Sequence, residues 1–210
     1  MSDRIAQFIV FFPVFLFSLS FHEAAHAWAA NRLGDPTAKM MGRLTLNPLA
    51  HIDWIGTVLF PLMMFLMPGL LLFGWARPVP VDPRNLRGGR VGNLKVSAAG
   101  PLANILLALI FAGIIRAILY LGLESPTVVI VAQILDTGVF LNLMLAFFNL
   151  IPIPPLDGSG ILAGVLPDRY LEGYERIARY GFLILIAGLY LGVFRILIIP
   201  IYGIARLILP

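Results

Sequence analysis

The sequence predicts an all-α polytopic membrane protein with about five to six membrane segments. Hydrophobic residues make up 60% of the 210 residues and charged residues 12%, and the mean hydropathy is +0.92. A chain this apolar has too few polar side chains to cover a surface that faces water, so we expect lipid around it. Its apolar runs are continuous rather than alternating, which favours helices over membrane-spanning strands.

The composition also excludes other classes of protein. A disordered chain or a secreted disulfide scaffold would not be this apolar. The chain has no cysteine, so it forms no disulfide bond and no thiolate metal site. The net charge is +4 at pH 7. In a membrane protein this excess reflects where basic loops lie, and we expect no nucleic-acid partner.

Five apolar runs are candidates for membrane segments, because a spanning helix needs ~20 mostly apolar residues. The first is too long, and too polar near its centre, for a cleavable signal peptide. The last is interrupted by Arg195 and Pro200, which predicts two short helices there. In chain order the runs are Ile5–Asn31, Trp54–Ala76, Val96–Ile115 (or on to Gly122), Val128–Leu150 and Tyr180–Leu209.

Three polar connections carry 11 of the 15 lysines and arginines: Arg32–Asp53, Arg77–Lys95 and Ile151–Arg179. Basic loops tend to stay in the cytoplasm, so all three are expected on that side. We expect these loops to be short and partly extended. None is long enough for a separate soluble domain, so residues 1–210 are expected to form one membrane-embedded unit.

This assignment of both flanking loops to the cytoplasm limits how the second apolar run can cross the membrane. If both flanking loops are cytoplasmic, Trp54–Ala76 cannot cross the membrane once. One interpretation is a re-entrant hairpin that breaks at Pro68-Gly69, since proline removes a backbone donor and glycine tolerates a tight turn. The other is a simple span, which the length of the run equally allows. Both interpretations remain open at this stage.

The first run contains the motif His22-Glu23-Ala24-Ala25-His26. On a helix the two histidines lie one turn apart on one face, ~6 Å along the axis, and both can reach one tetrahedral zinc. Glu23 is close enough to act as the general base of metal-assisted hydrolysis. A core helix without a metal is the alternative, but three ionisable residues inside an apolar span are costly unless a partner compensates them.

A catalytic zinc usually has three protein ligands, so a third is needed. His51 is the only other histidine, and Asp157 is the best-placed carboxylate. The prolines between Pro152 and Pro155 forbid a regular helix before Asp157. Unwound backbone at membrane depth must line a cavity or be packed in protein. An ordinary helix end with a turn is the alternative interpretation.

Helical rise places the two motifs at one depth. The histidines lie 6–10 residues before Arg32, which is ~9–15 Å of helix. Asn149 lies 13 residues after Asp136, which is ~20 Å of helix. If Asp136 marks the outer surface, Asp157 is able to meet the histidines.

These motifs, taken together, resemble the site-2 protease family of intramembrane zinc metalloproteases, in its small bacterial and archaeal branch. The family pattern has His-Glu-x-x-His in one membrane helix and Asn-x-x-Pro…Asp-Gly in a later one, in that order. The similarity covers residues 10–165 approximately. It also includes Gly100-Pro101-x-x-Asn104 and the stretches Gly42–Asp53 and Gly74–Pro83.

The resemblance implies that His22, His26 and Asp157 bind one Zn²⁺ per chain and that Glu23 is the catalytic base. Asn149 and Asn104 match polar positions near the site, with helix–helix hydrogen bonding as the alternative. His51 has three interpretations: a group behind a ligand, a fourth ligand, or a surface loop histidine, which its polar neighbours favour. Unlike many members of the family, the sequence shows no PDZ or CBS module.

The function expected from the resemblance is hydrolysis of peptide bonds in or near the transmembrane helices of membrane-protein substrates, single-pass proteins among them. We expect the protein in a prokaryotic cytoplasmic membrane, with the zinc site toward the cytoplasm. A zinc transporter is one alternative, although no second polar cluster lies deep on the far side apart from Asp136 and Asn142. A non-cleaving relative of the proteases is another. The sequence sets neither the substrate nor the oligomeric state.

Overall fold

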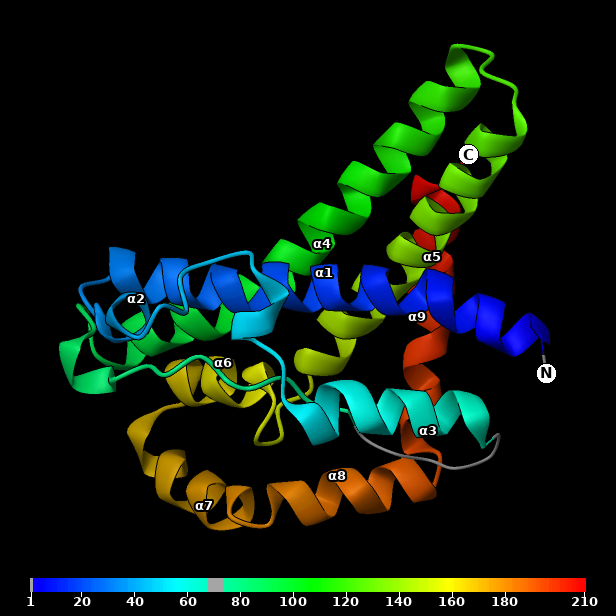
Figure 1. The fold of residues 1–210 in the computed structure, drawn as a ribbon. Coiled ribbons are helices and arrows are strands. Elements are labelled where there is room, and N and C mark those ends of the chain that lie inside the picture. The colour runs from blue at the N-terminus through cyan, green and yellow to red at the C-terminus, as the bar shows by residue number, and fades with distance from the viewer. Residues whose placement is uncertain (1, 68–73) are drawn as a thin grey trace.

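The structure is a computed structural model that describes residues 2–67 and 74–210. Every regular element in these ranges is a helix, as the sequence predicts. Three helices are long and apolar enough to cross a membrane, and they correspond to the first, third and fourth apolar runs. They are α1 (Ser2–Arg32), α4 (Arg90–Tyr120) and α5 (Pro126–Asn149). Figure 1 shows α4 and α5 as an antiparallel hairpin that α1 crosses.

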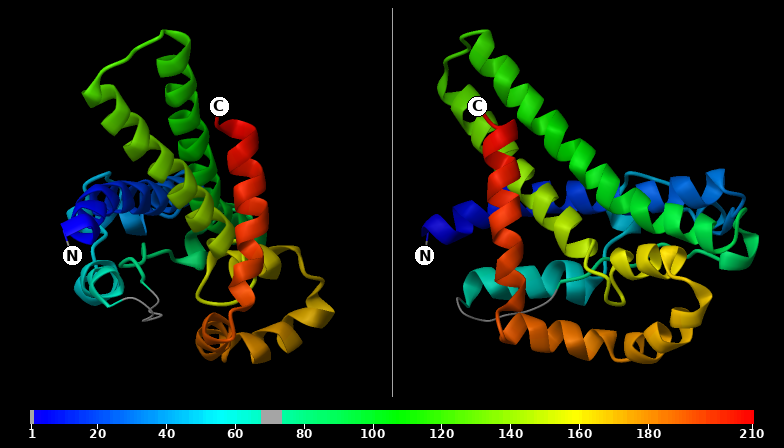
Figure 2. Two further views of the ribbon diagram at one scale, coloured as in Figure 1. Left: turned by 90° about the vertical axis from the view of Figure 1, so that its right-hand side faces the viewer. Right: turned by 180° about the vertical axis from the view of Figure 1, so that it is seen from behind.

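The α4–α5 hairpin forms the centre of the fold. Helix α5 begins where Ser125 Oγ accepts a hydrogen bond from the Val128 amide (3.2 Å), with proline in the first turn. Gly138 on α5 has no side chain, so the ring of Phe111 packs directly against its backbone. Helix α9 (Ile198–Ile208) lies beside the hairpin (Figure 2) and completes the core. The buried core residues are Ala108, Ala112, Ile115, Val139, Leu143, Ile201 and Ala205.

The second apolar run contains a short helical segment, and the chain that leaves the run lies beside the chain that enters it. The helical segment consists of a π-helical turn, η2 (Trp54–Leu59), followed by α3 (Phe60–Leu66). The Arg77 amide donates to the His51 carbonyl (2.9 Å), and Thr57 Oγ1 donates to the Trp75 carbonyl (2.8 Å). The chain therefore returns to where it entered, as the re-entrant interpretation requires. The expected break at Pro68-Gly69 lies outside the described residues.

The last apolar run forms two short helices, as predicted, but the break is elsewhere. Helix α8 (Gly181–Tyr190) is followed by a 3-10 turn, η4 (Val193–Leu197), and by α9, and the two parts are bent by 79°. The chain turns at Gly192, which has a φ of 70°. Pro200 lies near the start of α9 and does not interrupt the helical stretch from Val193 to Ile208.

The described ranges thus supply three long apolar helices, or four spans if the bent pair counts as one. The short apolar helices α3, α8 and α9 account for the remaining predicted segments. Among the described residues, the predicted extended loops form no β-ladder. The clearest of them runs without helix from residue 74 to 82. The all-α membrane class is confirmed.

Two further helices follow α5 and position the site. Helix α6 (Asp157–Val165) packs on α4, and α7 (Asp168–Ala178) is an amphipathic helix at the edge of the molecule (Figure 1). Arg90, the first residue of α4, binds the Ala163 and Leu166 carbonyls and the carboxylate of Asp168. This one guanidinium ties the start of α4 to the end of α6. The other helical turns are α2 (Thr37–Met40), η1 (Pro48–Ala50) and η3 (Pro83–Asn85).

Candidate metal centre and active-site cavity

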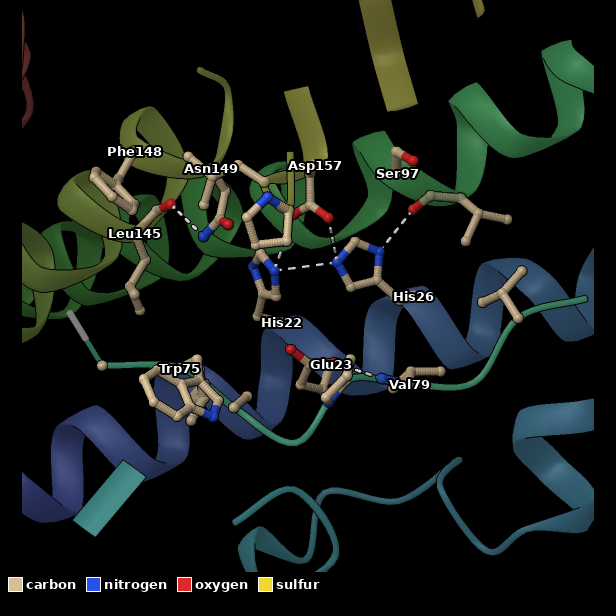
Figure 3. A pocket seen from close by; sticks show the side chains of 18 of the residues that line it. His22, Glu23, His26, Trp75, Val79, Ser97, Leu145, Phe148, Asn149 and Asp157 are labelled. Atoms are coloured by element: carbon tan, nitrogen blue, oxygen red, sulfur yellow. Dashed lines mark hydrogen bonds and ion pairs between the residues drawn. The ribbon is translucent and has the colours of Figure 1, made fainter. Parts of the chain in front are cut away.

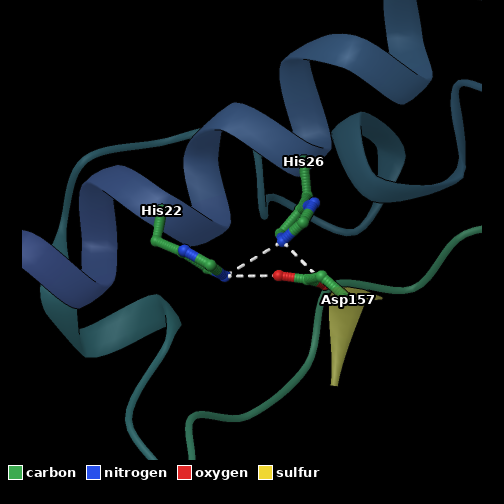
Figure 4. Close-up of side chains that lie close together, drawn as sticks. All are labelled: His22, His26 and Asp157. Carbon is green, nitrogen blue, oxygen red and sulfur yellow. Dashed lines mark hydrogen bonds and ion pairs between the residues drawn. The ribbon is translucent and has the colours of Figure 1, made fainter. Parts of the chain in front are cut away.

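Three predicted ligands meet at one point in the structure (Figure 4). His22 Nε2 lies 3.1 Å from His26 Nε2 and 3.1 Å from Asp157 Oδ2. His26 Nε2 lies 3.3 Å from Asp157 Oδ1. Both histidines are buried, and Asp157 is largely buried. Residues 135 positions apart in the chain therefore form a compact cluster, as the depth estimate predicts.

Each histidine uses its second ring nitrogen to bind an oxygen. His22 Nδ1 lies 2.6 Å from Asn104 Oδ1, and His26 Nδ1 lies 2.8 Å from the Val96 carbonyl oxygen. Because a carbonyl oxygen only accepts, each Nδ1 carries the proton and each Nε2 presents a lone pair. This tautomer is the one that binds a metal through Nε2.

The orientation of Asn104 is fixed by a buried polar network. Asn104 Nδ2 donates to the Ser18 carbonyl (3.2 Å) and to Asn142 Oδ1 (2.8 Å). Asn142 Nδ2 in turn donates to Ser18 Oγ (2.9 Å) and to the Gly138 carbonyl (2.8 Å). The network joins α1, α4 and α5, and it leaves Asn104 Oδ1 facing His22. The same contacts that hold three helices together therefore set the histidine tautomer.

The donor atoms fit a divalent cation. Two Nε2 lone pairs and a carboxylate converge, so these groups repel one another unless a positive charge lies between them. Asp157 Oδ2 is buried and has no hydrogen-bond partner. Two imidazoles and one carboxylate are also the ligand set of catalytic zinc sites, which keep a fourth position open. The residues present are therefore well suited to hold Zn²⁺.

Glycines let Asp157 reach the histidines. Asp157 is the first residue of α6, after a loop with a cis bond between Pro154 and Pro155. A Cβ on Gly158 would collide with the Leu150 and Ile151 carbonyl oxygens. On the face of α6 that meets α4, Gly160 lies against Ser97 and Gly164 against Leu94. Because these positions lack side chains, α6 approaches α4 closely and brings the carboxylate to the site.

Glu23 lies beside the cluster, in the same cavity (Figure 3). The cavity has a volume of about 440 Å³ and is lined by α1, α4, α5, the start of α6 and residues 74–81. Glu23 is 8% exposed, and its Oε2 accepts a hydrogen bond from the Val79 amide (3.2 Å). The cavity therefore brings together a metal-binding cluster and a carboxylate that is not one of its ligands.

The remaining predicted residues differ in their placement. Asn104 contacts His22 directly, which favours the site interpretation over simple helix pairing. Asn149 lines the cavity, while its Nδ2 donates to the Leu145 carbonyl of its own helix (2.9 Å). His51 does not join the metal cluster of the described residues. It lies in a loop but is only 1% exposed, so the prediction of a surface histidine is wrong.

His51 is buried because it organises its own loop. Its Nε2 donates to the Thr45 carbonyl (2.9 Å), and its backbone carbonyl receives the Arg77 amide. Sequence reasoning also missed the roles of Ser18, Val96 and Asn142. Asn142 stands out as an amide in an apolar helix. The carbonyl of Val96 carries no sequence signal, since every residue has one.

The fold and the site together define a helical membrane protein with a buried two-histidine, one-carboxylate centre of the zinc-hydrolase type. The model of Peptidase family M50 matches residues 120–189. The chain is 39% identical over 169 residues to "Putative zinc metalloprotease YwhC" of Bacillus subtilis, covering 80% of this chain and 74% of that protein. It is 31% identical over 182 residues to "Putative zinc metalloprotease Rip2" of Mycolicibacterium smegmatis, covering 87% and 67%.

This chain belongs to peptidase family M50, the site-2 protease family. A third relative, from Methanocaldococcus jannaschii, is similar over a shorter part: it is 40% identical over 70 residues, or 33% of each chain. No solved structure matches the chain. The family and the apolar helices identify an integral membrane zinc metalloprotease with Zn²⁺ as its cofactor.

Proposed function

We propose that this protease cleaves peptide bonds in or near the transmembrane helices of other membrane proteins. The observation that carries the proposal is the position of Glu23, which lines the same cavity as His22, His26 and Asp157. The cavity lies between α1, α4 and α5, the helices apolar enough to cross a membrane. A peptide bond that reaches this site is therefore cleaved among membrane helices.

The roles of the residues follow from their chemistry. Zn²⁺ held by three protein ligands makes water nucleophilic near neutral pH and polarises a peptide carbonyl. His22, His26 and Asp157 would hold the ion. Glu23 would take the proton of the attacking water and pass it to the leaving amine, as a positioned carboxylate does in general base catalysis. Asn149, on the cavity wall, would orient the substrate.

The substrate must reach the site in an extended form. A helix hides its carbonyls in hydrogen bonds, so it has to unwind locally before a peptide bond meets the cavity. The wall formed by residues 74–81 is itself extended, and it joins the end of the second apolar run to the start of the basic connection Arg77–Lys95. Pro78 and Pro80 have no N–H group, so this wall offers few donors for pairing with a substrate strand.

We also propose the orientation of the protein. The three basic connections follow the C-terminal end of α1, precede the N-terminal end of α4 and follow the C-terminal end of α5. These are the helix ends nearest to Asp157, and basic loops favour the cytoplasmic side. The zinc site would then open toward the cytoplasm of a prokaryotic cell. Lipid bilayer and membrane-protein substrates, single-pass proteins included, would be its partners.

A transport function is less well supported. A transporter needs ligands along a path to both faces of the membrane. Among the described residues, His22, His26 and Asp157 form the one group with metal-ligand geometry. Asn142 is fully occupied by Ser18, Gly138 and Asn104.

The test is cleavage of a single-pass peptide by the protein reconstituted in liposomes. Glu23→Gln should reduce cleavage at least ~100-fold, because a general base contributes about 10²–10⁴ in rate, while the zinc content stays at the wild-type level. Glu124→Gln, the same change at an exposed position, should cleave normally. Undiminished cleavage by Glu23→Gln, or cleavage that chelators do not block, would contradict the proposal. Zinc flux into the liposomes without cleavage would favour transport.

A further inference from the structure

The extended segment from Trp75 to Asp82 is anchored at both ends by residues that precede it in the chain. Near its start, Thr57 Oγ1 binds the Trp75 carbonyl, and the Arg77 amide binds the His51 carbonyl. At its end, the Asp82 amide donates to Asp35 Oδ2 (2.7 Å). The middle of the segment forms the cavity wall opposite the metal cluster, next to Glu23 (Figure 3).

Arg43 holds the middle of this segment. Its Nη2 donates to the Arg77 carbonyl (3.0 Å) and to the Pro78 carbonyl (3.0 Å). The side chain is buried, with 6% of the residue exposed, and its Nη1 has no hydrogen-bond partner. Burial and the neighbouring Arg77 lower the pKa of Arg43, and the charge of Glu23 opposes this. The guanidinium stays protonated in any case.

One of the two peptide groups that Arg43 binds also contacts the proposed base, Glu23. The Val79 amide donates to Glu23 Oε2. Pro78 and Pro80 have no N–H, so Val79 carries the only backbone donor among residues 78–80. Arg43 binds the Pro78 carbonyl, which belongs to the same peptide group as the Val79 N–H. Because a peptide group is planar, fixing its oxygen also fixes the direction of its N–H.

We propose that Arg43 is a positioning residue for Glu23: it orients the Pro78–Val79 peptide so that this N–H holds one carboxylate oxygen and leaves the other for the proton of water. This rests on the proposed role of Glu23 as the base. Arg43 itself does not line the cavity and would not touch the substrate. Without it, two carbonyls lose their donor and the peptide is free to rotate away from Glu23.

A double-mutant cycle with Arg43→Gln and Val79→Pro tests the proposal, since Val79→Pro removes the N–H itself. Each single change should lower kcat ~10–100-fold, as expected for a misplaced catalytic group, with KM and zinc content close to wild type. The double variant should be within about threefold of the worse single variant, because residues acting through one contact are not additive. The matched control is Arg84→Gln, which removes a positive charge from an exposed residue paired with Asp82.

Hydrogen exchange provides a readout that does not need activity. Among residues 78–80 only Val79 has an exchangeable backbone amide, so exchange followed residue by residue by NMR reports on this one contact. Arg43→Gln and Glu23→Ala should each accelerate exchange of this amide at least ~10-fold, as expected for loss of a local hydrogen bond, whereas Arg84→Gln should not. Exchange at Val79 that is unchanged in Arg43→Gln would overturn the proposal.

The two experiments separate the positioning role from the proposed function. Multiplicative loss of kcat in the double variant would show that Arg43 acts elsewhere, and loss of zinc in Arg43→Gln would show a role in folding instead of positioning. If the wild-type protein bound zinc but cleaved no helical peptide, the proposed function would fail. The exchange of the Val79 amide would still decide whether Arg43 orients this peptide toward Glu23.

Discussion

At the scale of single residues, the metal centre depends on the absence of a side chain at Gly100 as much as on its ligands. Gly100 on α4 faces both imidazoles, and a Cβ there would lie within van der Waals radii of His26 Nε2 and of His22. Any side chain at this position would occupy the space where the two nitrogens converge. Glycine is therefore required for close approach of α4 to the site, although its backbone is ordinary helix.

Gly100→Ala should abolish zinc binding and proteolysis. The added methyl group pushes the imidazoles apart, and overpacking of this kind costs ~1–3 kcal/mol in a well-packed core. Metal analysis and cleavage of a helical peptide check the result. Gly113→Ala is the matched control, because it lies on the same helix with no atom within 4 Å of the new methyl group. A zinc-replete, active Gly100→Ala protein would contradict this geometry.

Asn104 and Asn149 should respond differently to replacement by leucine. Asn104→Leu leaves His22 Nδ1, the Ser18 carbonyl and Asn142 Oδ1 without their partner. Loss of a group that orients a ligand lowers metal affinity about 10–100-fold. Asn149→Leu should keep wild-type zinc affinity and lose activity only. Competition with a fluorescent chelator measures both affinities, and equal affinities in the two variants would count against the role of Asn104.

At the scale of elements, a buried carboxylate after α1 organises the polar connections. Asp35 is fully buried and accepts hydrogen bonds from the Thr37 and Asp82 amides and from Asn85 Nδ2. Burial alone would raise the pKa of the Asp35 carboxyl, but these hydrogen bonds, with that of the Thr37 hydroxyl, outweigh burial and lower the pKa. Asp35 thus joins the end of α1 to the segment that carries Val79.

The stability that Asp35 contributes should depend on pH. A lowered pKa in the folded state means that the carboxylate stabilises the fold above its unfolded pKa of ~3.9, and that this contribution is lost as pH falls through the folded value. At pH 7, Asp35→Asn should therefore lower the free energy of unfolding by about 1–2 kcal/mol through lost hydrogen bonding, and the variant should unfold at a lower temperature. The difference should shrink below about pH 4.

Thermal unfolding of the purified protein between pH 7 and pH 3 checks this dependence. Asp136→Asn is the control, because it removes an exposed carboxylate on α5. A difference between wild type and Asp35→Asn that does not change with pH would show that Asp35 acts through packing and not through its charge.

The second apolar run should behave as a re-entrant element. His51 and Arg77 share a backbone hydrogen bond, so the loops on either side of the run lie on one side of the protein. Because the chain has no cysteine, single cysteines can be introduced without background. Leu49→Cys and Arg84→Cys should be labelled from one face of the membrane, and Leu123→Cys, in the turn between α4 and α5, from the other. Labelling of Leu49→Cys and Arg84→Cys from opposite faces would contradict the hairpin.

At the scale of the whole molecule, the sequence predicts most of the architecture because lipid makes apolar length the dominant signal. Helices α1 and α5 match the predicted segments to within three residues, whereas α4 begins at Arg90, six residues before the predicted Val96. The sequence places the break between α8 and α9 at Arg195 and Pro200, which are more conspicuous than Gly192, where the chain turns. A glycine with positive φ cannot be distinguished in sequence from one in a helix.

The site was predictable where chemistry requires particular side chains. His22, Glu23, His26 and Asp157 stand out because ionisable residues are costly in an apolar chain. The residues that orient them do not stand out. Val96 acts through its carbonyl, and in the sequence Arg43 is indistinguishable from other basic loop residues. His51 was misjudged because polar neighbours in sequence do not reveal that a loop folds over its own histidine.

The central claim is that one Zn²⁺ is held by two α1 histidines and the carboxylate that begins α6. Zinc per protein chain, measured on metal-free protein reloaded with one equivalent and desalted, tests it most directly. Wild type and Glu23→Gln should each retain close to one ion, and Asp157→Ala should retain almost none. Full retention of zinc by Asp157→Ala would contradict the account.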